Sequence, residues 1–319
     1  MNQIKLHKTI CFTLLMASLL ISSCLGNGRR TSDTQAKRSP APFTVPSIPP
    51  MLTNNADRAD FLAKNYWNNF DFSDTLLIGN QQITEQAFVN YLDIWPHVSE
   101  GALRLSISRT LEKAQVEPKM FIHFTDLFEK YLYDPNSAMR NEEYYAMVLD
   151  YIITSPSIDE LYKIQPKFYL ELINKNRLGT IATDFVYTMA NGKQGSMHKI
   201  KSEYLIIFFN NPGCSACIEY EQGLEYSPVV TKMLETGKLK ILAMYVDEDI
   251  YEWDKNRPNI PASWINGYDA FTTIRKNNSY DLRAIPNLYL LDKEKRVIMK
   301  DAMPHLLEEQ LVQILQNAI

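Results

Sequence analysis

The sequence predicts two folded regions of different class, an all-α region at residues 51–178 and an α/β region at residues 179–319. In the first region, apolar side chains recur at three- and four-residue spacing, as in amphipathic helices. After Gly179, short apolar runs alternate with helical stretches, which is typical of an α/β layer structure. With 45% hydrophobic residues, 22% charged residues and a net charge of −4, the composition argues against a disordered chain and against general nucleic-acid binding.

The N-terminus, residues 1–23, has the features of a bacterial lipoprotein signal peptide. Two lysines precede an apolar run at residues 10–21, which is shorter than the roughly 20 residues that a membrane span needs. The run ends in Ile-Ser-Ser-Cys, which resembles the lipobox of lipoproteins, in which the cysteine, here Cys24, is lipidated and anchors the chain by acyl burial. An ordinary secretory signal that happens to contain Cys24 is the alternative.

Residues 24–50 are rich in Ser, Thr, Pro, Asn and Gly, and their prolines keep the chain out of helices. We expect this segment to be a flexible tether. No acidic cluster of the kind that marks some surface-exported lipoproteins follows Cys24. The sequence therefore favours a periplasmic protein of the cell envelope, lipid-anchored to the inner or outer membrane.

The all-α region shows three clear stripes of apolar residues. They are Leu62, Tyr66 and Phe70; Leu103, Ile107 and Leu111; and Phe121, Phe124, Phe128 and Leu132. Pro118 fits the first turn of a helix, and Ser157 with Glu160 has the spacing of a capping box. The region has no cysteine and no Gly-rich phosphate loop, and we interpret His97 and His123 as structural.

The α/β region begins with a predicted hairpin at residues 185–200, turning at Asn191-Gly192-Lys193. The unbroken apolar run at residues 204–209 predicts a strand buried on both faces of a central sheet. Further strands are expected at residues 240–246, 288–291 and 296–300, and a closing amphipathic helix at residues 306–315.

A Cys-Ser-Ala-Cys motif, Cys214 and Cys217, directly follows the first buried strand. At a strand-to-helix junction, the helix terminus favours a thiolate on Cys214, and we expect its pKa to lie below that of a free thiol. Loss of water keeps Cys217 protonated. This asymmetry suits dithiol–disulfide exchange, in which Cys214 attacks a substrate disulfide and Cys217 then displaces the product.

Two structural interpretations compete with redox exchange. One is an inert disulfide, although two cysteines three residues apart close too small a loop to stabilise a fold much. The other is half of a zinc site, but no other cysteine remains once Cys24 is lipidated, and His198 and His305 are unpaired candidates. We expect no metal, and no cofactor other than the redox-active Cys214–Cys217 pair.

Taken with the segment that ends in Ile285-Pro286 before an apolar strand, the Cys-Ser-Ala-Cys motif resembles the thioredoxin fold, and within it the TlpA-type thiol–disulfide oxidoreductases. The resemblance covers about residues 178–319 and implies a cis peptide bond at Pro286, facing the cysteines. Proline has no N–H, so Ile285 would be free to pair with an extended substrate strand. An ordinary trans proline at a strand start is the alternative.

Pro286 follows Cys217 by 69 positions, which leaves room for the insert that TlpA-type members carry, here at about residues 248–278. Trp253, Trp264 and Tyr268 of this insert either shape a substrate groove or fill core. The all-α region also resembles a domain of unassigned function that precedes thioredoxin-like domains in bacterial lipoproteins, through Tyr-Trp-Asn-Asn-Phe-Asp-Phe at residues 66–72 and Glu-Gln-Ala-Phe-Val at residues 85–89.

The sequence departs from the family pattern in three places. Gly213 replaces the usual tryptophan before the first cysteine, Ser-Ala replaces the usual dipeptide ending in proline, and the strand at residues 204–209 carries no buried acid. TlpA-type enzymes often place a glutamate shortly after the second cysteine. Here Glu219 and Glu221 flank that position, and either is a candidate proton relay if it is not simply solvated.

The resemblance implies an enzyme, a lipid-anchored thiol–disulfide oxidoreductase that reduces protein disulfides and takes electrons from a membrane-bound donor. Oxidase and isomerase roles stay open, because direction depends on reduction potential. An envelope binding protein that uses the fold only as a scaffold is the alternative. A thiol peroxidase is disfavoured, since no activating threonine lies at the cysteine motif.

Overall fold

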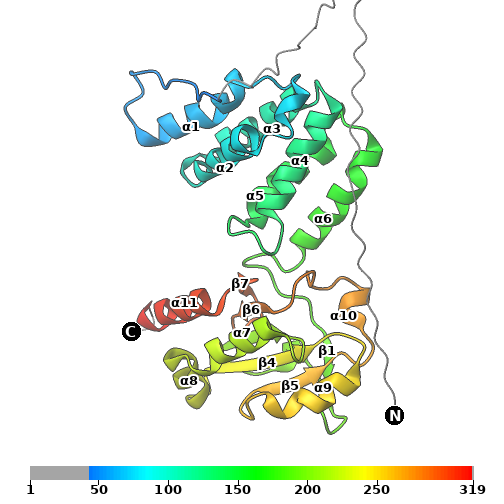
Figure 1. Cartoon of the computed structure of the whole chain (residues 1–319). Helices are drawn as coiled ribbons and strands as arrows, with labels where there is room; N and C mark the ends of the chain where they lie inside the picture. Colours follow the sequence, from blue (N-terminus) through cyan, green and yellow to red (C-terminus); the bar gives the residue numbers. More distant parts are fainter. Residues whose placement is uncertain (1–42, 318–319) are drawn as a thin grey trace, which may run out of the picture. The chain divides into compact units, whose positions relative to one another are not determined.

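The computed structural model describes residues 43–317. The predicted signal peptide, Cys24 and most of the predicted tether lie outside the described residues. Figure 1 shows helices α1–α6 first along the chain and then the mixed α/β elements. The predicted combination of an N-terminal all-α region with a C-terminal α/β region is confirmed.

Six α-helices make up the helical region as described. They are α1 (Asn55–Asn65), α2 (Gln86–Asp93), α3 (Glu100–Ala114), α4 (Pro118–Leu132), α5 (Glu142–Thr154) and α6 (Ile164–Asn174). Shorter turns of 3-10 or π type lie at Tyr66–Asn69, Thr75–Leu77, Gln81–Glu85, Trp95–His97 and Glu160–Lys163. Pro118 opens α4 as predicted, where its missing N–H costs no helical hydrogen bond.

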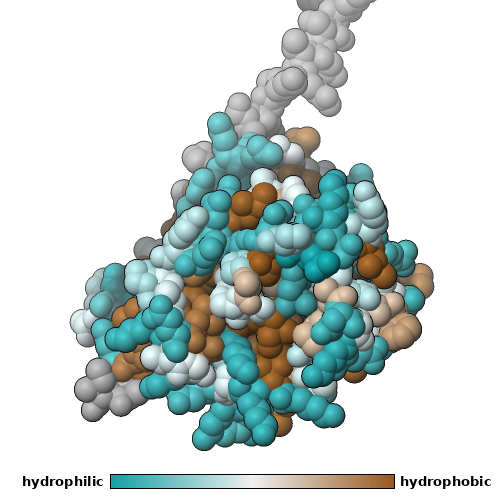
Figure 2. Space-filling view, turned by 90° about the horizontal axis from the view of Figure 1, so that it is seen from below, coloured by the Kyte–Doolittle hydropathy of each residue, from teal (hydrophilic) through white to brown (hydrophobic). Residues whose placement is uncertain are grey.

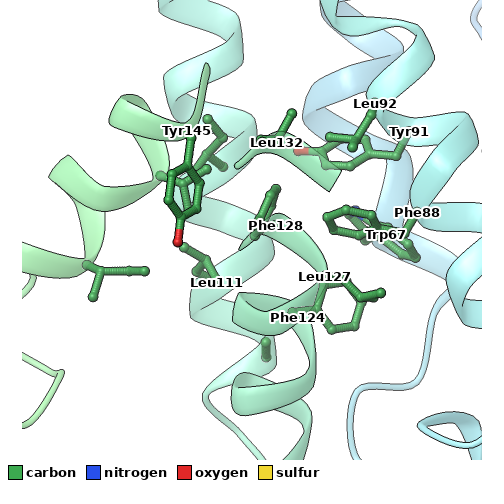
Figure 3. Packing of buried hydrophobic residues seen from close by; sticks show 14 of the residues in the cluster. Trp67, Phe88, Tyr91, Leu92, Leu111, Phe124, Leu127, Phe128, Leu132 and Tyr145 are labelled. Atoms are coloured by element: carbon green, nitrogen blue, oxygen red, sulfur yellow. The ribbon is translucent and has the colours of Figure 1, made fainter. Parts of the chain in front are cut away.

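An aromatic cluster forms the core of the helical region (Figure 3). The indole of Trp67 lies edge-on to Phe124, with ring centroids 5.1 Å apart, and Phe88 meets Phe128 in the same way at 4.8 Å. Edge-to-face contacts of this kind add to the free energy gained by burying the rings. The apolar stripes predicted in α3 and α4 are buried in this core.

The predicted tether, residues 24–50, includes residues that contact the helical region. Phe43 packs against the rings of Tyr66 and Trp67, at centroid distances of 5.3 and 5.4 Å, and Asn69 donates a hydrogen bond to the carbonyl of Thr44. Partial burial of the Phe43 ring stabilises the contact of this stretch with the helical core. Residues 43–50 therefore belong with the helical region.

The α/β region holds one sheet with the strand order β2-β1-β5-β4-β3-β6-β7. The strands are β1 (Val186–Thr188), β2 (Gln194–Ser196), β3 (Tyr204–Phe209), β4 (Leu239–Tyr245), β5 (Ile265–Tyr268), β6 (Asn287–Leu291) and β7 (Val297–Lys300). The helices are α7 (Ser215–Glu225), α8 (Pro228–Glu235), α9 (Ile250–Asn256), α10 (Thr273–Lys276) and α11 (Pro304–Asn317), with 3-10 turns at Met197–Lys199 and Arg257–Asn259. The hairpin, the closing helix and four of the five later strands match the sequence prediction, whereas β5 lies within the predicted insert and was not expected as a strand.

β3 lies at the centre of the sheet, parallel to β4 and antiparallel to β6. Its side chains alternate between two cores. Leu205, Ile207 and Phe209 pack with residues of β1 and α10 on one face, and Ile206 and Phe208 pack with α7, α8 and α11 on the other. Because both faces are covered, the strand is apolar throughout, as the sequence indicated.

In the part of the chain that the structure describes, no helix is both long enough and apolar enough to span a membrane. On the face seen in Figure 2, hydrophobic side chains gather in patches separated by hydrophilic ones.

Candidate active site

The candidate site lies where β3 ends and α7 begins, at the centre of the sheet. Residues 210–213 form the connecting loop, and Gly213 there has a φ of 75°. Side chains with a Cβ rarely adopt this conformation, which makes glycine the suitable residue immediately before the first cysteine. Cys214 then occupies the N-cap of α7. The predicted position of the cysteine pair at a strand-to-helix junction is confirmed.

The two sulfurs lie in different environments. Cys214 is partly exposed, and its side chain accepts no capping hydrogen bond from the first turn of α7. Cys217, one turn further on, is buried with 4% of its surface exposed, and the backbone N–H of Asn211 donates to its Sγ at 3.3 Å. Both are free thiols.

Burial raises the pKa of the Cys217 thiol to about 12, and the adjacent Cys214 adds to this shift, against the opposing hydrogen bond from Asn211. Desolvation disfavours the charged thiolate relative to the neutral thiol. The direction of this shift agrees with the expectation that the second cysteine stays protonated. A nucleophilic thiolate is disfavoured at Cys217, and Cys214 is the more accessible of the two sulfurs.

A pocket of about 110 Å³ borders Cys217. Its walls come from the loop after β3, from α7 and from the segment of α9 and the turn that follows; among its lining residues are Asn211, Glu221, Trp253 and Arg257. Glu221 is half-buried, and burial together with the charge of Glu225 raises the pKa of its carboxyl. Glu219 is exposed and does not line the pocket. Of the two predicted relay candidates, the structure brings only Glu221 to the buried sulfur's pocket.

The peptide bond between Ile285 and Pro286 is cis, which confirms the prediction. β6 begins at the next residue, Asn287, which pairs with Phe209 at the end of β3. The proline therefore lies beside the point where the chain leaves the sheet toward Cys214. Within the described residues, the backbone N–H and C=O of Ile285 form no hydrogen bond.

The predicted insert contributes both to the core and to the pocket. Trp264 packs against Phe208 in the core, with ring centroids 6.2 Å apart. Trp253 packs against Tyr268 in a tilted arrangement, with ring centroids 4.5 Å apart. It donates its indole N–H to Asn266 at 3.0 Å and lines the pocket. Trp264 therefore fills core, whereas Trp253 is buried and also lines the pocket.

Across residues 43–317, no three His, Cys, Asp or Glu side chains come together in a way that could hold a metal ion. The Nε2 atom of His198 lies 2.7 Å from the carbonyl oxygen of Ala182, a local structural contact. His97 is exposed in the turn after α2, and burial lowers the pKa of His123.

A thioredoxin-like protein from Bacteroides caccae, known from a crystal structure at 1.90 Å resolution, is similar to this chain over nearly its whole length. The two sequences are 47% identical, the TM-score is 0.79, and the match covers 85% of this chain and 98% of that one. This chain belongs to the thioredoxin-like proteins.

Two shorter structures are also similar to this thioredoxin-like chain. One is the C-terminal domain of an uncharacterized protein from Bacteroides fragilis, with 47% identity over 43% of this chain and 98% of that one, and a TM-score of 0.43. The other is a domain of a possible thiol-disulfide isomerase from Cytophaga hutchinsonii, with 25% identity over 46% of this chain and 97% of that one, and a TM-score of 0.40.

A family model described as a domain of unknown function, DUF5106, matches residues 23–176 of this thioredoxin-like chain. This agrees with the resemblance of the helical region to a domain without an assigned activity. A search of curated proteins found no match.

Sequence reasoning missed the pocket beside Cys217, apart from Glu221 and the suggestion of a groove at Trp253. It also missed the Asn211 N–H that donates to the buried sulfur of this thioredoxin-like site. No local motif marks these residues, because the pocket forms only when the segment around α9 folds back against α7.

Proposed function

We propose that this chain is a lipid-anchored thiol–disulfide oxidoreductase of the cell envelope that reduces protein disulfides. The observation that carries the proposal is the unequal cysteine pair: Cys214 is accessible at the start of α7, and Cys217 is buried with a raised pKa. The signal-peptide pattern and the lipobox-like sequence around Cys24 support the location.

In the proposed reaction, the Cys214 thiolate attacks one sulfur of a substrate disulfide. The substrate S–S bond breaks, its other sulfur leaves as a thiolate, and a mixed disulfide forms on Cys214. Cys217 then loses its proton and attacks Cys214 Sγ, which releases the second substrate thiolate and closes the Cys214–Cys217 disulfide. The substrate gains two electrons and the protein loses two, so a membrane-bound dithiol reductase must supply two electrons for the next cycle.

The free backbone of Ile285 beside Pro286 supports a docking role for an extended substrate strand. Such a strand would bring its disulfide toward Cys214, because β6 and β3 are adjacent. The proposed substrate class is therefore a protein disulfide in an extended or locally unfolded segment.

The direct test is reduction of insulin by the purified protein with dithiothreitol as electron source. We expect precipitation of the insulin B chain at least about tenfold faster than with dithiothreitol alone, and no acceleration by the Cys214→Ser variant. A reduction potential near that of thioredoxin, about −270 mV, would agree with a reductase, whereas one near −120 mV would indicate an oxidase. Absence of any acceleration by the wild-type protein would leave only the scaffold interpretation.

Glu221 is proposed to accept the proton of Cys217 in the second step, since it lines the pocket beside that residue. Its carboxyl accepts a proton only when ionised, so release of the mixed disulfide should slow as the pH falls through its raised pKa. We expect Glu221→Gln to slow this step by about tenfold or more and to remove that acidic limb of the pH profile. Acid-quenched single-turnover reactions measure the step.

Glu219→Gln is the matched control, because it makes the same change two residues earlier on the same helix at an exposed position. An unchanged pH profile in Glu221→Gln, or an equal effect of both substitutions, would show that Glu221 does not relay the proton.

A further inference from the structure

The segment that leads to Ile285 and Pro286 is anchored by side chains of the helical region. Residues 277–286 lie between α10 and β6 and form neither helix nor strand. Near the start of the segment, Asn176 donates a hydrogen bond from Nδ2 to the carbonyl of Ser279 at 2.8 Å. Because the segment has no strand pairing of its own, its conformation depends on side-chain contacts of this kind.

Arg283, two residues before Ile285, packs directly on the helical region. Its guanidinium carbon lies 3.4 Å from the ring centroid of Tyr133, and its Nη2 donates to the Tyr133 carbonyl at 3.4 Å. The same guanidinium donates three hydrogen bonds to the Asp281 carboxylate, two from Nε at 2.9 and 3.2 Å and one from Nη2 at 2.8 Å. This combination of stacking and forked hydrogen bonding is specific to arginine and fixes the orientation of the group.

Arg140, which precedes α5, reaches the same segment from the helical region. It forms ion pairs with Asp301 and, at 3.9 Å, with Asp281, and it also binds Glu142 at 2.8 Å. Glu142 in turn binds Lys300 of β7 at 2.7 Å. Arg140 therefore bridges the segment of residues 277–286 and the end of the last strand.

Together these groups form a junction cluster of three cations and three anions: Arg140, Glu142, Asp281, Arg283, Lys300 and Asp301. Only 3% of the Asp281 side chain is exposed. Burial alone would raise the pKa of Asp281, but hydrogen bonds and charge from Arg283, with a contribution from Arg140, hold it below its usual value. Removing one partner from such a group leaves a buried charge uncompensated, so the surrounding backbone must shift or take up water.

We propose that Tyr133 and Arg140 are positioning residues, through which the helical region fixes the Asp281–Pro286 segment in the conformation that docks an extended protein substrate. The inference rests on the proposed function and assigns the helical region a part in it. Reaction with a disulfide too small to dock on this segment then needs Cys214 and Cys217 but not the junction cluster. Misplacement of a substrate by about 1 Å can cost as much as a hundredfold in rate, so a modest shift of the segment is enough to be measured.

The test compares two substrates in single-turnover reactions of the pre-reduced, full-length protein. Insulin carries disulfides in peptide segments, whereas hydroxyethyl disulfide offers no peptide to dock. In Arg140→Gln we expect the rate constant with insulin to fall by about tenfold and that with hydroxyethyl disulfide to stay within about twofold. Arg140→Lys, which keeps the charge, should restore part of the insulin rate. Acid quenching followed by thiol alkylation measures oxidation of the protein with either substrate.

Arg283→Lys is the second variant, because it changes a residue of the Asp281–Pro286 segment itself and keeps a positive charge beside Asp281. It should show the same selective loss even if Arg140→Gln does not fold. Arg104→Gln is the matched control, since Arg104 also forms ion pairs in the helical region, with Glu100 and Asp150, away from the junction cluster. It should leave both rate constants unchanged.

Equal losses with both substrates, or no loss with either, in the folded variants would overturn the positioning role. Wild-type protein that reacts with neither substrate would instead overturn the proposed function, and the positioning role with it. A selective loss of insulin reduction supports both.

Discussion

Replacing Cys217 with serine is expected to trap the protein in mixed disulfides with its substrates, whereas replacing Cys214 with serine is expected to prevent any reaction. The difference follows from the order of attack. In the proposed mechanism, Cys214, which is partly exposed, forms the first bond, while the buried Cys217 acts only on the mixed disulfide. Serine cannot perform that second step, and attack by a neighbouring group is much faster than attack by a thiol from solution. The lifetime of the mixed disulfide should therefore rise by about a hundredfold or more.

The measurement is non-reducing gel electrophoresis of envelope extracts after rapid acid quenching and alkylation. Bands of higher mass that disappear on reduction should be abundant in Cys217→Ser and absent in Cys214→Ser. A variant with both cysteines replaced gives the background from other thiols. Equal trapping by the two single variants, or none by either, would contradict the assigned order of attack.

Features encoded by neighbouring residues could be predicted from the sequence. The apolar run at residues 204–209 lies in the centre of the sheet because both of its faces are covered. The cysteine pair directly follows this strand, so its position at the start of α7 is fixed by connectivity alone. The cis bond before Pro286 was implied by the family resemblance, and no local propensity would have indicated it.

Features that depend on distant residues could not be predicted. The distinction between Glu219 and Glu221 needed the rotation of α7 relative to the segment around α9, because one side chain faces solvent and the other lines the pocket. Arg140 and Asp281 are far apart in sequence, and either would ordinarily be interpreted as a solvated surface charge.

Local spacing also misled in one place. The interpretation of Ser157 with Glu160 as a capping box is wrong, because the carboxylate of Asp159 caps this turn by accepting from the N–H of Leu161 at 2.8 Å. The Ser157 hydroxyl donates instead to Gln115 at 2.7 Å. A serine that finds a partner on another helix is no longer available to its own helix.

The second large effect concerns the reactivity of the two thiols toward a small alkylating reagent. Alkylation requires the thiolate, and with a pKa of about 12 only on the order of one Cys217 in 10⁵ is ionised at pH 7. Burial further restricts access of the reagent to this sulfur. Cys214 is partly exposed at the N-terminus of α7, so the reagent reaches its sulfur more easily.

The most direct test of the unequal cysteine pair is therefore timed alkylation of the reduced, folded protein with iodoacetamide at pH 7, with each cysteine assigned by fragmentation mass spectrometry. Cys214 should react more than about a hundredfold faster than Cys217, and the difference should vanish when the protein is unfolded in guanidinium. Indistinguishable rates at the two sulfurs in the folded protein, or faster reaction at Cys217, would contradict the proposed dithiol mechanism.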